Sequence, residues 1–87
     1  MILDIKKRAS AGTLQSNDCI VTVTPSDELY ISVKSILFKE CGKDIEKTVL
    51  NTLKSLGIDK INLEIDDKGA LDETIIYRIK KAVERAL

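Results

Sequence analysis

The alternation that decides the fold lies in residues 19–25, which read CIVTVTP. The first, third and fifth residues fall on one side of an extended chain, and the β-branched content is typical of a pleated strand. Pro25 cannot donate a hydrogen bond to a sheet ladder, so the strand should stop before it. The sequence therefore predicts a strand over residues 19–24 with one buried face.

A second strand is predicted a few residues further on. Residues 25–28, PSDE, are typical of a turn, and Leu29, Ile31 and Val33 then alternate with more polar residues. Because the connection is short, we expect the two strands to form an antiparallel hairpin. Residues 35–42 are ambiguous, since their apolar part could extend the strand or begin a helix.

Apolar residues recur at helical spacing in two later stretches, which predicts two amphipathic helices. The first apolar stripe comprises Ile45, Val49, Leu50, Leu53 and Leu56, and the second comprises Ile75, Ile76, Ile79, Ala82, Val83 and Ala86. Asp44 and Asp72 are candidate N-caps, and Gly57 suits the left-handed residue that ends a helix. Between the helices, residues 61–65 alternate between apolar and polar and predict a third strand.

The order of these elements is ββαβα. It predicts an α+β fold, a small two-layer domain whose three-stranded sheet carries two helices on one face. If the second and third strands lie parallel, the first helix is the crossover between them. The chain has 87 residues and no Gly- or Pro-rich linker, so residues 1–87 are expected to form a single domain. Residues 1–9 fit a short strand, a helical turn or a partner-dependent arm.

Charge and aromatic content weigh against a nucleic-acid surface. Fourteen basic and fourteen acidic residues give zero net charge, and the aromatic residues are two Tyr and one Phe. The basic cluster at residues 6–8 is more typical of a solvated patch than of a phosphate site. No apolar run approaches the roughly twenty residues that span a bilayer, and the N-terminus lacks a signal peptide's apolar core. We therefore expect a cytoplasmic protein.

Candidates for ordinary catalysis are few. The chain has no histidine, so the usual general base for a serine or cysteine nucleophile is missing. Asp66 and Asp67 should face opposite sides of a strand, which favours a solvated turn ordered by Asp67 over an acid/base pair or metal site. Cys19 and Cys41 lack CxxC spacing, and we interpret them as reduced thiols, with Cys19 packed. The sequence predicts no metal site and no catalytic residue.

The most distinctive polar stretch is residues 11–18, which read AGTLQSND. Gly12 permits backbone angles closed to other residues, and short polar side chains at residues 16–18 favour a turn. Ser16 is therefore expected to be exposed on a bendable loop. A serine in such a loop is usually a solvated linker residue, so the loop alone does not indicate a function.

This loop, the strand that ends at Thr24-Pro25, and the stretch DDKGALD at residues 66–72 together resemble the acyl carrier protein, or gamma subunit, of citrate lyase. The resemblance covers nearly the whole chain. It implies a non-catalytic carrier subunit in which Ser16 is joined by a phosphodiester to 2'-(5''-phosphoribosyl)-3'-dephospho-coenzyme A. Residues 1–17 would then be an N-terminal arm and attachment loop that could be flexible.

The resemblance also implies a reaction cycle and partners. The thiol of the attached group would carry acetyl and citryl thioesters while citrate is cleaved to acetate and oxaloacetate. The implied partners are the alpha (acyl transferase) and beta (citryl lyase) subunits and a prosthetic-group transferase. Residues 66–72 could serve only as a turn, or they could contact the prosthetic arm or a partner. In the second case Lys68 would attract the phosphates of the arm. The competing hypothesis is an unmodified protein-interaction module that scaffolds a larger complex.

Overall fold

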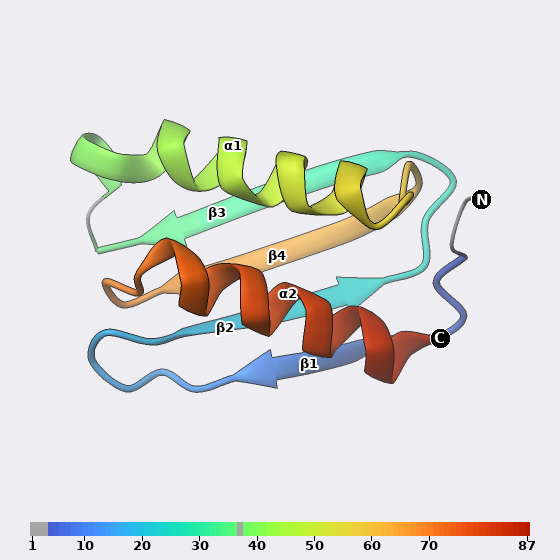
Figure 1. Ribbon diagram of the computed structural model, residues 1–87, viewed down its shortest axis with the longest axis horizontal. Helices are drawn as coiled ribbons and strands as arrows, with labels where there is room; N and C mark the ends of the chain where they lie inside the picture. The colour runs from blue at the N-terminus through green and yellow to red at the C-terminus, as the bar shows by residue number, and fades with distance from the viewer. Residues whose placement is uncertain (1–3, 37) are drawn as a thin grey trace.

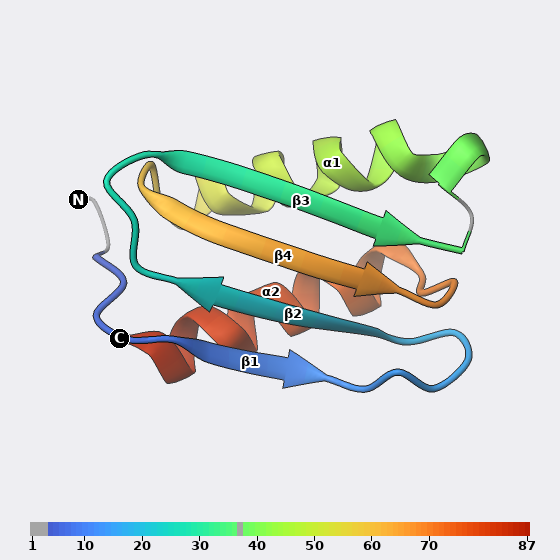
Figure 2. The same ribbon diagram turned by 180° about the vertical axis from the view of Figure 1, so that it is seen from behind.

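The protein is a four-stranded mixed sheet covered on one face by two helices. The computed structural model describes residues 4–36 and 38–87, and of residues 38–41 only the backbone is described. The elements are β1 (Ala9–Gly12), β2 (Cys19–Thr24), β3 (Leu29–Ser35), α1 (Phe38–Ser55), β4 (Ile61–Asp67) and α2 (Asp72–Ala86). Both helices lie on the same side of the sheet (Figures 1 and 2). The predicted two-layer α+β architecture is confirmed.

Strand β4 occupies a central position that the predicted hairpin did not allow for. The sheet order is β1-β2-β4-β3, with β2 antiparallel and β3 parallel to β4. The predicted hairpin of β2 with β3 is therefore wrong, because β4 lies between them. The predicted crossover is confirmed, since α1 connects the parallel strands β3 and β4. The inward side chains Ile61, Leu63 and Ile65 are at most 2% exposed, while Leu29 of β3 is 39% exposed. The inward face of β4 is thus buried more completely than that of the edge strand β3.

A fourth strand, β1, makes the predicted count of three strands wrong. Its sequence, ASAG, has no β-branched or aromatic residue, so no strand propensity marks it. It pairs antiparallel with β2, buries Ala11 and receives a hydrogen bond from Arg85 Nη1 of α2 to the Ser10 carbonyl (2.9 Å). The backbone amides of Lys6 and Lys7 donate to the Ala86 carbonyl, so residues 6 and 7 lie beside the end of α2 (Figure 1).

Helix α1 begins earlier than its predicted cap. It starts at Phe38, so Asp44 lies inside the helix and the predicted N-cap is wrong. The end of α1 agrees with the prediction, because Gly57 has a φ of 73° and the Ile58 amide donates to the Leu53 carbonyl (3.0 Å). Such a left-handed glycine satisfies carbonyls that the last helical turn leaves without partners.

At the start of helix α2, Leu71 and not the predicted Asp72 occupies the N-cap position. Leu71 occupies the N-cap position in an extended conformation, with no side-chain capping bond, and Asp72 is the first helical residue. The predicted cap at Asp72 is therefore wrong by one position. Its carboxylate still lies in the first turn, where a negative charge is favoured by the helix dipole.

The core lies between the helices and the sheet. From α1 it takes Ile45, Val49 and Leu53, and from α2 it takes Ile75, Ile79, Ala82, Val83 and Ala86, packed on the inward side chains of β1, β2 and β4. Both predicted stripes are confirmed, although Leu50, Leu56 and Ile76 are only half-buried. Neither helix, within residues 4–36 and 38–87, has the length and hydropathy needed to cross a membrane.

Candidate functional site: the loop that carries Ser16

Two loops lie side by side at one end of the sheet. Residues 13–18 connect β1 to β2, and residues 68–71 connect β4 to α2 (Figure 1). The Asn17 amide donates to the Lys68 carbonyl (2.8 Å), and the Lys68 amide donates to the Asp18 carbonyl (2.9 Å). These bonds continue the β2–β4 ladder beyond the strands. The loop between β1 and β2 is therefore held to the sheet at its second half.

The first half of the loop depends on Gly12. This residue has a φ of 115°, and a Cβ there would collide with the Cys19 carbonyl oxygen of the neighbouring strand. Only glycine can make this approach without displacing the backbone. The Thr13 amide then donates to the same Cys19 carbonyl (3.1 Å), which closes the base of the loop.

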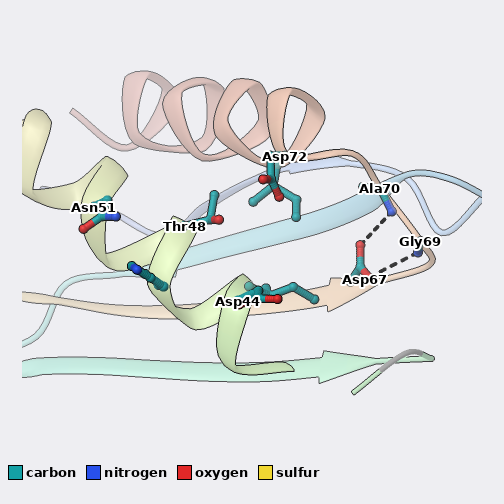
Figure 3. Close-up of a pocket in the computed structure, with 10 residues that line it drawn as sticks. Asp44, Thr48, Asn51, Asp67, Gly69, Ala70 and Asp72 are labelled. Carbon is teal, nitrogen blue, oxygen red and sulfur yellow. Dashed lines mark hydrogen bonds between the residues drawn. The ribbon is translucent and has the colours of Figure 1, made fainter. Parts of the chain in front are cut away.

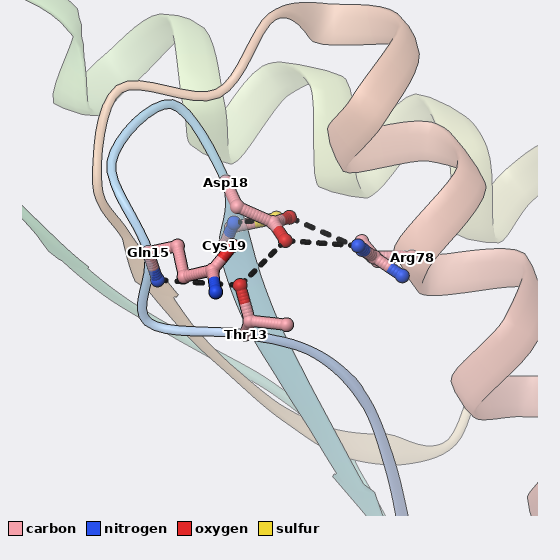
Figure 4. Close-up of polar contacts among 5 residues, drawn as sticks. All are labelled: Thr13, Gln15, Asp18, Cys19 and Arg78. Carbon is pink, nitrogen blue, oxygen red and sulfur yellow. Dashed lines mark hydrogen bonds and ion pairs between the residues drawn. The ribbon is translucent and has the colours of Figure 1, made fainter.

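Asp18 fixes the base of the loop to helix α2 (Figure 4). Arg78 Nε and Nη2 donate to its two carboxylate oxygens at 3.1 and 2.8 Å, an arrangement that is bidentate. Thr13 Oγ1 donates to Oδ2 and the Cys19 amide to Oδ1, each at 2.7 Å. The hydrogen bonds from Arg78, then those from Thr13 and Cys19, lower the pKa of Asp18 to about 2. This carboxylate is charged throughout the physiological range.

Ser16 lies at the tip of the loop between these fixed points. The Asp18 amide donates to the Gln15 carbonyl (3.2 Å), which closes a turn around Ser16 and Asn17, and Asn17 has a φ of 65°. Asparagine tolerates this left-handed conformation better than most residues. Ser16 is exposed, as the sequence predicts. Its hydroxyl is therefore displayed at the tip of a loop whose base is held by hydrogen bonds.

The neighbouring loop is ordered by a buried carboxylate. Asp67 is 2% exposed and accepts hydrogen bonds from Ser35 Oγ (2.8 Å), the Gly69 amide (3.2 Å) and the Ala70 amide (2.9 Å), of which Figure 3 shows the last two. The expectation that Asp67 orders the turn is confirmed, but it is buried and not solvated. Asp66 faces the other side of the sheet and pairs with Lys68 Nζ at 3.5 Å. The two carboxylates are not an acid/base pair.

Cys19 also lies at this end of the sheet, and its thiol is a poor nucleophile. Cys19 is fully buried with its thiol unbonded to another cysteine, and its predicted packing is confirmed. Burial, with a smaller contribution from the charges of Asp18 and Asp67, raises its pKa to about 12. The Cys41 side chain lies outside the described residues. In the part of the chain that the structure describes, no three His, Cys, Asp or Glu side chains are grouped to hold a metal ion.

Comparison with known proteins supplies the family. The family described as malonate decarboxylase delta subunit matches residues 6–86. The citrate lyase acyl carrier protein of Treponema denticola is 45% identical over 84 residues, which cover 97% of both chains. The protein of the same name from Clostridium perfringens is 48% identical over 86 residues, 97% of this chain and 85% of that protein. This chain belongs to the citrate lyase acyl carrier protein family.

A solved structure supports the fold of this citrate lyase acyl carrier protein family member. The crystal structure of a Pseudomonas malonate decarboxylase hetero-tetramer in complex with malonate contains a chain that matches with a TM-score of 0.84 at 18% identity. The match covers 99% of this chain and 90% of that chain. At this level of identity the likeness concerns the fold alone.

Sequence reasoning about this acyl carrier protein family member missed Arg78 and the bonding role of Asp18. The two residues are 60 positions apart, so no local pattern joins them. One signal was present: Arg78 lies beside Ile75 and Ile79 at the edge of the apolar stripe of a predicted helix, where a half-buried charge gains from a partner. The structure supplies this partner as Asp18, which the sequence does not distinguish from the other acidic residues.

Proposed function

We propose that this chain is the acyl carrier subunit of a citrate lyase and that Ser16 is the attachment site of its prosthetic group. The observation that carries the proposal is the exposed Ser16 at the tip of a loop fixed at both flanks. The names of the relatives, citrate lyase acyl carrier protein, support the carrier role. The proposed group is 2'-(5''-phosphoribosyl)-3'-dephospho-coenzyme A.

The residues around Ser16 fit a covalent phosphodiester. An attaching enzyme needs an accessible hydroxyl, and Ser16 offers one while Asn17 and Asp18 hold the following backbone in place. Asp18 is already engaged by Arg78, so its charge is neutralised and does not repel the incoming phosphates. The chain therefore presents the Ser16 hydroxyl to solvent, and the Asp18 carboxylate two residues away is paired with Arg78.

The carrier role explains why the domain needs no catalytic groups of its own. The attached group supplies a terminal thiol that holds the acyl chain as a thioester. This chain anchors that thiol and keeps it at high effective concentration near the active sites of its partners. The proposed partners are the alpha (acyl transferase) and beta (citryl lyase) subunits and the prosthetic-group transferase. Bond making and breaking in citrate belongs to those partners.

The decisive experiment is the intact mass of the protein purified from a host that makes the whole complex. We expect an added mass that matches the prosthetic group, located at Ser16 by peptide mapping. A Ser16→Ala variant should lack the added mass and keep the unfolding midpoint of the unmodified wild type, because an exposed loop serine supports little packing. Unmodified protein in an active complex would overturn the proposal.

A further inference from the structure

A groove runs between helices α1 and α2. It consists of a cavity of about 360 Å³ at its near end and one of about 370 Å³ at its far end. Thr48, Asn51 and Asp72 line both cavities, so the two adjoin each other. Figure 3 shows the near end, with Thr48 and Asn51 on α1 and Asp72 on the opposite side. Each cavity falls in the size range of small-molecule sites.

The groove starts beside the loop that carries Ser16. Gly69 lines the near cavity, and a Cβ at Gly69 would lie 3.6 Å from Asn17 Oδ1. Asn17 is the residue directly after Ser16. The near end of the groove therefore lies close to the residue that follows Ser16, and Gly69 has no side chain to block a chain that enters from there.

The lining favours a ligand that donates hydrogen bonds and carries no negative charge. The near cavity is lined by three carboxylates, Asp44, Asp67 and Asp72, and by one ammonium group, Lys47. The far cavity is lined by one carboxylate, Asp72, and one ammonium group, Lys80. Its Thr52 and Ser55 hydroxyls already donate to backbone carbonyls at 2.7 Å, so their lone pairs remain as acceptors. A phosphate in the near cavity would meet like charges. Amide and hydroxyl donors would meet acceptors.

We propose that this groove docks the uncharged, amide-rich pantetheine segment of the arm attached at Ser16. The inference rests on the proposed function, because it requires the arm to be there. In the arm this segment has two amide N–H groups and one free hydroxyl along an extended chain, because its terminal hydroxyl is esterified to phosphate. These donors suit two adjoining cavities with acceptors on their walls. The phosphates of the arm stay outside, near the loop between β1 and β2.

Tethering makes weak intrinsic affinity sufficient. A short flexible tether gives an effective concentration on the order of millimolar. A groove with a millimolar dissociation constant for free pantetheine would then hold the arm about half of the time. The arm is sheltered between transfers and still leaves readily for a partner's active site.

The test uses unmodified ¹⁵N-labelled protein titrated with pantetheine up to about 10 mM, a range set by the expected millimolar affinity. We expect saturable amide shifts at Thr48, Asn51, Gly69 and Ala70. An Asn51→Leu variant should bind about threefold more weakly or worse, because it loses one hydrogen-bonding group. Ser32→Ala, on the uncovered face of the sheet, is the matched control and should bind as the wild type does.

A second ligand tests the charge argument. Phosphopantetheine differs from pantetheine by a terminal phosphate, and we expect it to bind no more tightly than pantetheine. Tighter binding of the phosphate form would overturn the assignment to the uncharged segment. An absence of shifts at the groove amides with pantetheine would overturn the groove itself.

The failure of this inference and the failure of the carrier assignment are distinguishable. The titration needs no modified serine, whereas the intact mass needs no groove. Added mass at Ser16 with no response to pantetheine leaves the carrier role and removes the docking site. A native protein without added mass removes the carrier role, and the docked arm with it, whatever the titration gives.

Discussion

At the scale of single residues, Asp18 joins the loop that carries Ser16 to both layers of the fold. Its carboxylate accepts from Thr13 in the loop, from the first amide of β2 and from Arg78 of α2. The Asp18 side chain is 15% exposed and the Arg78 side chain 28%, so the pair is partly shielded from solvent. Such a charge-assisted, bidentate contact gives geometric precision as well as energy.

The lowered pKa of Asp18 predicts a defined pH dependence. The folded pKa is about 2 against an ordinary value of 3.8, so the stabilisation is complete above pH 4 and is lost as the pH falls towards 2. Allowing for solvent screening, we expect the contribution to be about 1 kcal/mol. The measurement is the urea unfolding midpoint from pH 5 to pH 2 for the wild type and for Asp18→Asn.

The difference between the two midpoints isolates Asp18 from the other carboxylates. It should be largest above pH 4 and shrink below it. Asp27→Asn provides the control, since Asp27 is exposed on the connection between β2 and β3 and should leave the profile unchanged. A difference between wild type and Asp18→Asn that stays constant from pH 5 to pH 2 would contradict the assigned pKa.

At the scale of elements, the turn that leaves β1 depends on a glycine that no other residue can replace without movement. Gly12 and Gly69 both have positive φ, 115° and 91°, but only at Gly12 would a Cβ collide with a backbone carbonyl. Gly12→Ala should therefore cost more than Gly69→Ala, which we expect to cost about 1 kcal/mol from φ strain alone. Denaturant unfolding of the two variants gives the comparison, and equal costs would refute the close approach.

The elements that sequence predicts best are those with strong periodicity. Both helices and the strands β2, β3 and β4 follow from their apolar spacing, and the ladder positions of Asp66 and Asp67 follow from alternation. β1 escapes detection because ASAG has no side chain that favours a strand, and its place depends on the open edge of β2. The hairpin was wrong because a short connection between strands suggests pairing, yet β4 displaces β3 from beside β2.

The candidate site likewise has features that the sequence predicts and features that it does not. Exposure of Ser16 follows from local turn chemistry, which sequence carries. The contact between Asp18 and Arg78 and the approach of Gly69 to Asn17 bring together residues far apart in the chain, so they depend on how α2 and β4 pack. The groove between α1 and α2 has no sequence signature at all, because its lining residues are ordinary surface residues of two helices.

At the scale of the whole molecule, the fold separates a closed body from the exposed loop that carries Ser16, the proposed attachment point. A thioester cargo is attacked by thiolates, so a carrier benefits from keeping its own thiols protonated and enclosed. Cys19 meets both conditions, because it is fully buried and its pKa is raised to about 12. The layers that bury the hydrophobic core would thus also keep this thiol away from an acyl group on the arm proposed at Ser16.

This separation predicts that Cys19 is alkylated only when the whole domain opens. In a Cys41→Ser background at pH 8, iodoacetamide should label Cys19 at least about a thousandfold more slowly than an exposed thiol, since a domain of this length has roughly 4 to 13 kcal/mol of stability. Adding Ser16→Cys to the same background supplies the exposed thiol for comparison. The slow rate should rise with urea in proportion to the unfolded fraction. Fast labelling of Cys19 without urea would mean that local opening exposes it and that the body does not protect the cargo.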